Sequence, residues 1–333
     1  MANYFCINCM RPLDTDAAIC PYCGFDRRRY VAPEMTLQPG NTLAHGKYLL
    51  GRTLGQGGFG VTYVALDRLL ELRVAIKEYL PQNMAYRSEG SASLHWHSNV
   101  LSKQAGWESF VKEARKMAKM DQIPGIVRVR EVFYENETAY IVMDYVEGET
   151  LWSRLRKTGA MDGKTCLAVL RPVMNALTEA HKNNMIHRDI SPDNIMLDNQ
   201  NRVWLLDMGA AKELDTTQTG DLRHSTTMVV KPGFSPLEQY TSGGNTGPWT
   251  DVYAMSATVL YCMSGKMPPL STDRVLHDAL EIPNAIPPTV ARVLLRGLAL
   301  RPEDRIQSMV ELRDALETAV NAPDETEIEN PEA

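Results

Sequence analysis

Four of the six cysteines lie within the first 23 residues, as the pairs Cys6-x-x-Cys9 and Cys20-x-x-Cys23. In each pair, a tight turn over two intervening residues can aim both thiolates at one zinc ion, at about 2.3 Å from each sulfur. Two such pairs complete a closed tetrahedral site. The spacing therefore predicts a structural zinc ribbon over residues 1–27, whose folding depends on the metal. Two disulfides are the alternative, which a reducing cytosol disfavours.

A glycine-rich turn is the second segment that could do chemistry, with the sequence Leu54-Gly55-Gln56-Gly57-Gly58-Phe59-Gly60. Glycines let backbone amides approach phosphate oxygens closely. A dinucleotide site would need a helix directly after the turn, whereas Val61-Thr62-Tyr63-Val64 is typical of a strand. The segment is therefore expected to be a strand–turn–strand flap over a nucleotide.

A lysine follows on the next expected strand, Val74-Ala75-Ile76-Lys77. The alternation places Ala75 and Lys77 on the same side of the strand. Lys77 would then reach phosphates, and Glu113, on the helical face shared with Phe110 and Met117, is placed to be its anionic partner. Taken alone, Lys77 would be assigned to the solvated surface.

The third cluster is His187-Arg188-Asp189-Ile190-Ser191-Pro192-Asp193-Asn194, followed at short range by Asp207-Met208-Gly209. With the glycine-rich turn and Lys77, these motifs resemble the eukaryotic-like (Hanks-type) protein kinase family in order and spacing, over about residues 48 to 318. Glu238 stands where the family has the Glu of A-P-E. Arg305 would be its buried ion-pair partner. Together with the ribbon, the chain resembles prokaryotic zinc-ribbon serine/threonine kinases.

The resemblance implies transfer of the γ-phosphate of ATP to hydroxyl groups of protein substrates. Asp189 would accept the proton of the substrate hydroxyl, and Lys77, held by Glu113, would contact the phosphates. Asn194 and Asp207 would hold Mg²⁺ or Mn²⁺. The residues implied to bind the nucleotide are Leu54, Gly55, Gln56, Gly57, Gly58, Phe59, Gly60, Val61, Thr62, Ala75, Lys77, and the backbone of Asp144 and Val146.

Three positions depart from the family pattern. Met208 replaces the usual Phe, and Thr62 replaces the Val that covers the base. The third is Ser191, where serine/threonine kinases usually carry a Lys near the transferred phosphoryl group. Lys231 stands where the family usually has a Thr that contacts that Lys. The hypothesis is that Lys231 points into the site and replaces the missing charge; the alternative is that Lys231 is solvated and Ser191 marks a weakened enzyme.

Regulation is also implied by the resemblance. The segment Ala210–Phe234 would be the activation loop, and it is rich in Ser and Thr. Thr227 aligns with the usual activating phosphorylation site, and Arg188 would be the partner of its phosphate. The alternative is a flexible polar loop without modification.

The order of sequence patterns predicts an α+β fold. Five β-branched runs with one interrupting helix, Gly106–Asp121, precede a mostly helical half, as in a bilobal protein kinase with a five-stranded antiparallel N-lobe and one regulatory helix. The expected organisation is a zinc ribbon (1–27), a linker (28–47), a kinase domain (48–320) and an acidic disordered tail (321–333). Cys166 and Cys262 lie in apolar helical patterns and are expected in the core.

Composition narrows the function further. The net charge is −6, and five of the acidic residues lie in the tail, so the body is nearly neutral and nucleic acid is not an expected partner. The chain has no apolar run near the roughly 18 residues that a membrane span needs. It also begins without a secretory signal pattern, so a cytoplasmic protein is expected. The expected partners are protein substrates and a protein that binds the ribbon.

A different class of function stays open on the sequence. A nucleotide-binding pseudokinase scaffold would act through its ribbon and tail, and Ser191 is the best support for it. The presence of Lys77, Glu113, Asp189 and Asn194 argues against that alternative. A small-molecule kinase of similar fold is a third hypothesis, disfavoured by Glu238, Asp251 and Arg305.

Overall fold

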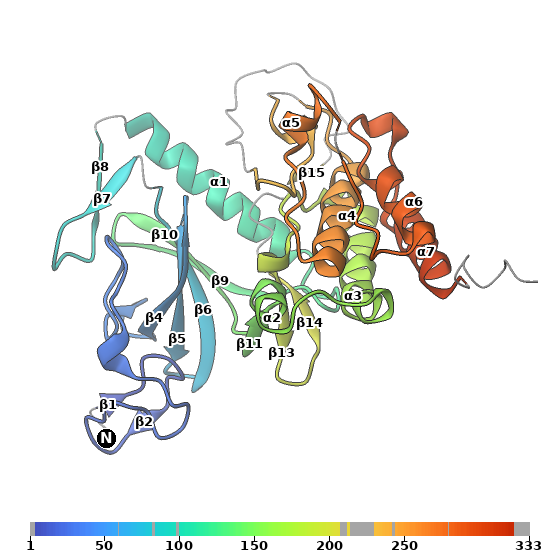
Figure 1. Cartoon of the computed structure of the whole chain (residues 1–333). Coiled ribbons are helices and arrows are strands. Elements are labelled where there is room, and N and C mark those ends of the chain that lie inside the picture. Colours follow the sequence, from blue (N-terminus) through green and yellow to red (C-terminus); the bar gives the residue numbers. More distant parts are fainter. Residues whose placement is uncertain are drawn as a thin grey trace, which may run out of the picture. The chain divides into compact units, whose positions relative to one another are not determined.

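The computed structural model describes residues 4–58, 60–81, 84–97, 100–206, 212–213, 230–241, 244–278 and 280–322. The chain divides into two compact units (Figure 1). The N-terminal unit comprises Met1–Asp121 and Arg128–Tyr145, and the C-terminal unit comprises Gln122–Val127 and Val146–Ala333. In the ranges given above, no helix is long and apolar enough to cross a membrane.

A small ribbon begins the N-terminal unit. Strand β1 (Tyr4–Phe5) pairs antiparallel with β2 (Pro12–Leu13), and the short 3₁₀ helix η1 (Arg27–Arg29) follows. The apolar cluster of the ribbon contains three buried cysteines and one buried leucine, with Phe25 packed against them. So small an apolar cluster buries little surface, which is typical of a segment that a metal ion holds folded.

An antiparallel sheet forms the body of the N-terminal unit, in the order β3-β4-β5-β6-β10-β9. The strands are β3 (Thr42–Leu43), β4 (Tyr48–Gly57), β5 (Gly60–Asp67), β6 (Leu72–Tyr79), β9 (Val129–Glu135) and β10 (Thr138–Asp144). The five long strands confirm the five predicted from β-branched runs. The sixth, β3, was not predicted because two residues carry no periodic signal.

One helix accompanies this sheet, α1 (Val100–Ala118). It begins six residues before the predicted start, because the polar residues of its first turns show no apolar periodicity. Between β6 and α1 the chain forms a hairpin of β7 (Ala85–Arg87) and β8 (Leu94–Trp96).

The segment expected as a linker, residues 28–47, packs on the sheet. Leu37 and Leu43 in it are each 1% exposed and belong to the core of the N-terminal unit. The backbone N–H of Leu37 donates to the hydroxyl of Tyr63, and that hydroxyl donates to the buried carboxylate of Glu78. The segment is thus part of the unit's core, and its Pro and Gly residues mark turns within it.

The C-terminal unit is mostly helical, as predicted. Its helices are α2 (Leu151–Thr158), α3 (Gly163–Lys182), α4 (Pro248–Ser264), α5 (Ser271–Arg274), α6 (Pro288–Gly297) and α7 (Met309–Asn321), with 3₁₀ turns η2 (Pro192–Asn194), η3 (Leu237–Gln239) and η4 (Pro302–Asp304). Its short strands are β11 (Gly148–Thr150), β12 (Met185–Ile186), β13 (Ile195–Asp198), β14 (Val203–Leu205) and β15 (Lys212–Glu213).

Helix α4 is the centre of this unit. Every residue from Thr250 to Met263 is buried, and the helix contacts α3, α6 and α7 (Figure 1). Cys166 and Cys262 are 1% and 0% exposed, which confirms both as core residues. A helix that is apolar on all sides must be enclosed by its neighbours.

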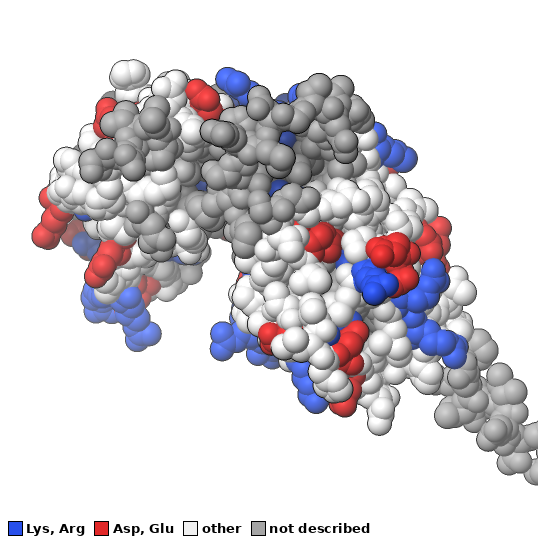
Figure 2. Space-filling model, turned by 90° about the horizontal axis from the view of Figure 1, so that it is seen from above, with Lys and Arg blue, Asp and Glu red and all other residues white. Residues whose placement is uncertain are grey.

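Several predictions lie outside the described residues: Phe59, the segment 207–211 with Asp207, Thr227 in the segment 214–229, and the tail after residue 322. On the face of the molecule drawn in Figure 2, the described basic and acidic side chains are interspersed.

Candidate active site and metal centre

The glycine-rich turn joins β4 to β5. At Gly55, Gly57 and Gly58 an added Cβ would meet nothing within 4 Å, and none of the three has a positive φ. Neither packing nor backbone conformation therefore requires glycine at these positions, whereas a phosphate group lying against the backbone would. At Gly60, in contrast, a Cβ would lie 2.5 Å from the carbonyl oxygen of Glu78, so the β5–β6 contact itself requires glycine.

Lys77 lies on β6 opposite Thr62 of β5, and Ala75 lies opposite Val64. The ion pair expected between Lys77 and Glu113 of α1 is present, with 3.9 Å between Nζ and Oε1. The two side chains are only 15% and 16% exposed. An ion pair at this burial is less screened by water than a surface pair and holds the ammonium in place.

The structure limits which atoms of Val61 and Asp144 can contact a nucleotide. The side chain of Val61 is fully buried in the core cluster of the N-terminal unit. It lies on the face of β5 opposite to that of Thr62, because successive side chains alternate, so only the backbone of Val61 remains a candidate contact. The N–H of Asp144 donates to the carbonyl oxygen of Arg128 at 3.0 Å. A contact of Asp144 with a base would therefore use its carbonyl oxygen.

In the C-terminal unit, Asp251 of α4 organises the loop of residues 187–194. Its carboxylate accepts hydrogen bonds from the backbone N–H groups of His187 and Arg188, at 2.9 and 2.8 Å, and contacts Nε2 of His181 at 2.7 Å. Burial alone would raise the pKa of Asp251, but the hydrogen bond from His181 and the N–H of Arg188 outweigh it and lower the pKa. Asp251 thus stays charged in the core and anchors the loop.

Asp189 and Asn194 lie together in this loop. The side-chain amide of Asn194 donates to the backbone carbonyl of Asp189 at 2.7 Å and to its Oδ2 at 2.8 Å. Both bonds use the NH₂ group, so the amide oxygen of Asn194 is the atom left to ligate a cation. The N–H of Leu206, the residue before Asp207, donates to the carbonyl of Asn194.

Lys231 contacts this same loop. Its Nζ lies 2.8 Å from Oγ of Ser191 and 2.8 Å from Oδ2 of Asp193. Ser191 is fully buried, and the Lys231 side chain is 28% exposed. The ammonium of Lys231 therefore lies beside Ser191, the position at which serine/threonine kinases usually have a lysine.

Arg188, within the loop of residues 187–194, has an unusual backbone conformation. Its φ of 67° is in the left-handed region, which is strained for a residue with a side chain. Its carbonyl accepts a hydrogen bond from the side chain of Gln239. Its Nε is buried and has no hydrogen-bond partner among the described residues, and burial lowers the pKa of the guanidinium.

The predicted ion pair between Glu238 and Arg305 is confirmed. Nη1 of Arg305 lies 2.8 Å from Oε1 of Glu238, with side chains 0% and 7% exposed. Thr250 donates to the same carboxylate oxygen, and Arg305 also donates to the carbonyl of Trp249. This pair connects η3 to the loop that precedes α7.

Replacing Arg305 with Met should lower the free energy of unfolding by about 3–5 kcal/mol, because it leaves the Glu238 carboxylate buried without its partner. Urea denaturation measures the change. The matched control is Arg296→Met, which breaks a pair with Glu311 whose side chains are 63% and 45% exposed. That control should cost less than about 1 kcal/mol. Equal losses in the two variants would contradict the structural role of the buried pair.

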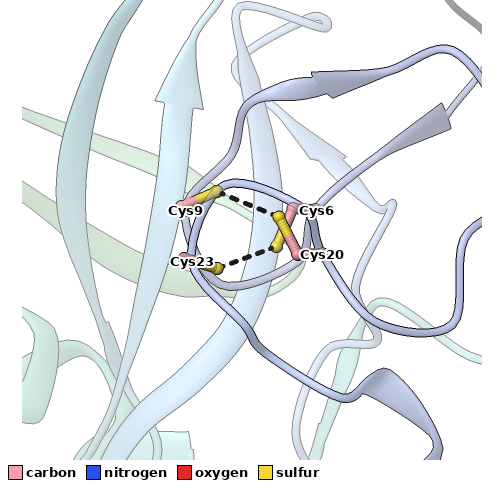
Figure 3. Close-up of side chains that lie close together, drawn as sticks. All are labelled: Cys6, Cys9, Cys20 and Cys23. Atoms are coloured by element: carbon pink, nitrogen blue, oxygen red, sulfur yellow. Dashed lines mark hydrogen bonds between the residues drawn. The ribbon is translucent and has the colours of Figure 1, made fainter.

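The four N-terminal cysteines converge on one point (Figure 3). Their sulfur atoms all lie within 4.8 Å of one another, with 3.7 Å between Cys6 and Cys23 and 3.8 Å between Cys9 and Cys20. A tetrahedral site with zinc–sulfur bonds of about 2.3 Å has sulfur–sulfur edges of about 3.8 Å. The residues therefore fit zinc, and the separations exceed the roughly 2.05 Å of a disulfide bond.

The thiols differ in acidity. Burial raises the pKa of Cys9 to about 12. At Cys23, burial would also raise the pKa, but hydrogen bonds from the N–H of Phe25 and the amide of Asn8 lower it to about 7. The thiolate form is thus reached more readily at Cys23 than at Cys9, whose proton a bound metal ion would have to displace.

Two residues that organise the loop were not assigned that role from the sequence, His181 and Asp251. A signal for Asp251 was present, because it is the one acidic residue in the apolar pattern Thr250–Met263. An acidic residue there needs a buried partner. His181 stands near the end of an apolar helical pattern, and nothing in its spacing points to Asp251.

These features together define the kinase class of proteins. The N-terminal unit has an antiparallel sheet with one helix, a glycine-rich turn and a Lys–Glu ion pair, and the helical C-terminal unit has a loop in which Asn194 binds Asp189. A family model described as protein kinase domain matches residues 48–310, and the chain belongs to this family. The resemblance and the α+β fold class predicted from the motifs are thereby confirmed.

Similar proteins are bacterial serine/threonine kinases. Serine/threonine-protein kinase PknA of Nostoc sp. is 29% identical over 84% of this chain and 48% of its own length. PrkC of Bacillus subtilis is 27% identical over 83% and 41%. The chain thus spans about half the length of these curated relatives. The solved structure "PpkA-294 apo form" is 32% identical, with a TM-score of 0.68, over 85% of this chain and 99% of that one.

Proposed function

We propose that the protein is an active serine/threonine kinase that transfers the γ-phosphate of ATP to hydroxyl groups of proteins. The observation that carries the proposal is the pair of hydrogen bonds from Asn194 to Asp189. They hold a carboxylate in a defined orientation on a loop that Asp251 anchors. The names of the bacterial relatives support serine/threonine specificity.

The roles follow from chemistry and position. Asp189 orients the substrate hydroxyl and accepts its proton, while Lys77, held by Glu113, binds phosphate oxygens. Asn194 and Asp207 are the proposed ligands of Mg²⁺ or Mn²⁺ through amide and carboxylate oxygens. When bound, this ion neutralises charge on the phosphates. Phosphoryl transfer depends mainly on such positioning.

For the nucleotide, we propose that the backbone of residues 55–60 contacts the phosphates. Leu54, Thr62 and Ala75 would line the base, and Thr62 and Ala75 lie on the same face of the sheet as Lys77. The carbonyl oxygen of Asp144 and the backbone of Val146 would form hydrogen bonds with the polar edge of the base.

We propose further that Lys231 supplies the cation that Ser191 lacks. The support is the two contacts of its ammonium, with Ser191 and with Asp193 in the catalytic loop. A positive charge at this place would offset charge on the transferred phosphoryl group. Serine at position 191 then serves as a hydrogen-bond partner that holds the relocated lysine.

Regulation by phosphorylation at Thr227 is also proposed. Arg188 supports it, because a buried guanidinium whose Nε has no hydrogen-bond partner among the described residues is suited to an anion. A phosphate brings nearly two negative charges and three acceptor oxygens. Phosphopeptide mapping tests the site.

For the rest of the chain, we propose a structural zinc ribbon at residues 1–27, a kinase domain at 48–320 and an acidic tail at 321–333. Thiolate ligands persist in a reducing compartment, which supports a cytoplasmic location. The exposed aromatic side chains Tyr4 and Tyr22 are where a protein partner of the ribbon would contact it.

Phosphotransfer from labelled Mg-ATP tests the function. Purified protein is incubated alone and with a generic protein substrate, and the labelled amino acid is identified. We expect label on serine or threonine, no label after chelation of divalent ions, and about 10³-fold slower labelling with the Asp189→Asn variant. Label confined to tyrosine would contradict the specificity.

The second candidate, a pseudokinase scaffold, has one favourable observation, Ser191 in place of the expected lysine. It predicts measurable ATP binding without transfer to any substrate, at any concentration of Mg²⁺ or Mn²⁺. The same experiment therefore separates the two functions.

A further inference from the structure

The first cysteine pair of the ribbon lies directly on β4, within the N-terminal unit. The backbone N–H of Arg52 donates to the carbonyl oxygen of Ile7 at 2.7 Å. This contact requires glycine at the preceding position, because a Cβ on Gly51 would lie 2.4 Å from that oxygen and 2.5 Å from the sulfur of Met10. The ribbon and β4 thus meet backbone to backbone, with no room for a side chain between them.

Strand β4 is irregular at this place. Its register with β5 shifts between Leu50 and Thr53 and again between Thr53 and Gly55. The N–H of Thr53 donates to the hydroxyl of Tyr30 at 2.9 Å, just as the N–H of Arg52 donates to the ribbon. Two consecutive N–H groups of β4 therefore have their acceptors in residues 7–30. Such bulges set the local twist of a strand and the direction in which it continues.

One side chain connects this contact to the metal ligands. Asn8 lies between Cys6 and Cys9, and its amide donates to Sγ of Cys23 at 3.6 Å. Its Oδ1 accepts a hydrogen bond from Nε of Arg52 at 2.6 Å. The Arg52 guanidinium also lies over the ring of Phe25, 5.9 Å from the centroid.

We propose that the ribbon is an internal support for the glycine-rich turn, so that zinc occupancy sets the affinity of the chain for ATP. The inference rests on the proposed function only in that ATP binds this turn. Gly55 lies three residues beyond Arg52 on the same strand. Loss of the metal unfolds the cysteine turns and removes Ile7 and Asn8 as acceptors, and β4 then leads into the turn without its bulged geometry. Arg52 and Asn8 are positioning residues in this arrangement.

The test compares two variants with the full chain. Arg52→Leu removes the side-chain link to Asn8 and leaves the cysteines intact, while Asn8→Ala removes the same link from the ribbon side. The control is Arg68→Leu, because the Arg68 guanidinium bonds Gly46, outside the ribbon. For each protein, zinc content is measured by elemental analysis, the dissociation constant of ATP by calorimetry, and kcat at saturating ATP.

We expect Arg52→Leu to retain one zinc, to bind ATP about fivefold more weakly and to keep kcat within about twofold. Zinc-depleted wild-type protein should show at least the same loss of affinity, and Arg68→Leu none. An unchanged dissociation constant in either link variant that still holds zinc overturns the inference. Because ATP binding is measured directly, wild-type protein that binds ATP without transferring phosphate contradicts the proposed function alone. Wild-type protein that binds no ATP overturns both.

Discussion

The Asp189→Asn variant is expected to bind ATP as the wild-type protein does and to transfer phosphate about 10³-fold more slowly. An amide has nearly the shape of the carboxylate but cannot accept the proton of the substrate hydroxyl, and a positioned base contributes about 10²–10⁴-fold. The hydrogen bond from Asn194 to Oδ2 of Asp189 can persist to the amide oxygen. Loop geometry should therefore survive while the chemical step slows.

Steady-state kinetics measures the fall in kcat, and calorimetry measures whether the dissociation constant of ATP stays unchanged. The matched control is Asp304→Asn in η4, an exposed residue of the C-terminal unit that should leave both quantities unchanged. A rate above about one tenth of the wild-type value would show that Asp189 is not the base. A parallel loss of ATP affinity would instead indicate a disrupted loop.

The second large effect is expected at Lys231. Lys231→Ala should lower kcat about 100-fold, since removal of one preorganised electrostatic contact typically costs about 10²–10³-fold. The paired exchange Ser191→Lys with Lys231→Thr restores the arrangement usual in the family. It should recover most of the lost rate, because the ammonium then approaches the same place from the catalytic loop.

The exchange distinguishes a catalytic charge from a local ion pair. If Lys231 serves only to neutralise Asp193, at 2.8 Å, then Asp193→Asn should rescue Lys231→Ala. Rescue by the paired exchange, without rescue by Asp193→Asn, is the expected result. The control is Lys266→Ala, which removes an exposed lysine of the same unit and should leave kcat unchanged. Unchanged kcat in Lys231→Ala would contradict the proposal.

Much of the fold was predictable because its signals are local. Runs of β-branched residues located the five long strands of the N-terminal sheet, and the apolar helical pattern around Cys262 predicted its burial in the core. The start of α1 and the short strand β3 were missed, because polar turns and two-residue strands carry little periodic signal. The supposed linker was misjudged for a related reason: Leu37 and Leu43 are isolated apolar residues in a stretch whose Pro and Gly content resembles a linker.

By itself, the sequence determined which residues to propose for phosphoryl transfer and for zinc binding. Eight consecutive residues contain both Asp189 and Asn194, whose proposed roles the resemblance to protein kinases implies, and two C-x-x-C pairs contain the four clustered cysteines. Position in the motif order was also enough to pair Glu238 with Arg305 and to nominate Lys231.

Only the tertiary structure decided which distant residues support these motifs. The contact of Asp251 with His187 spans 64 positions, and that of Arg52 with Asn8 spans 44. Hydrogen bonds of this kind depend on how sheets and helices pack, and no periodicity along the chain records which polar groups will face one another. The seating of the ribbon on β4, which makes it part of the N-terminal unit, follows from that packing alone.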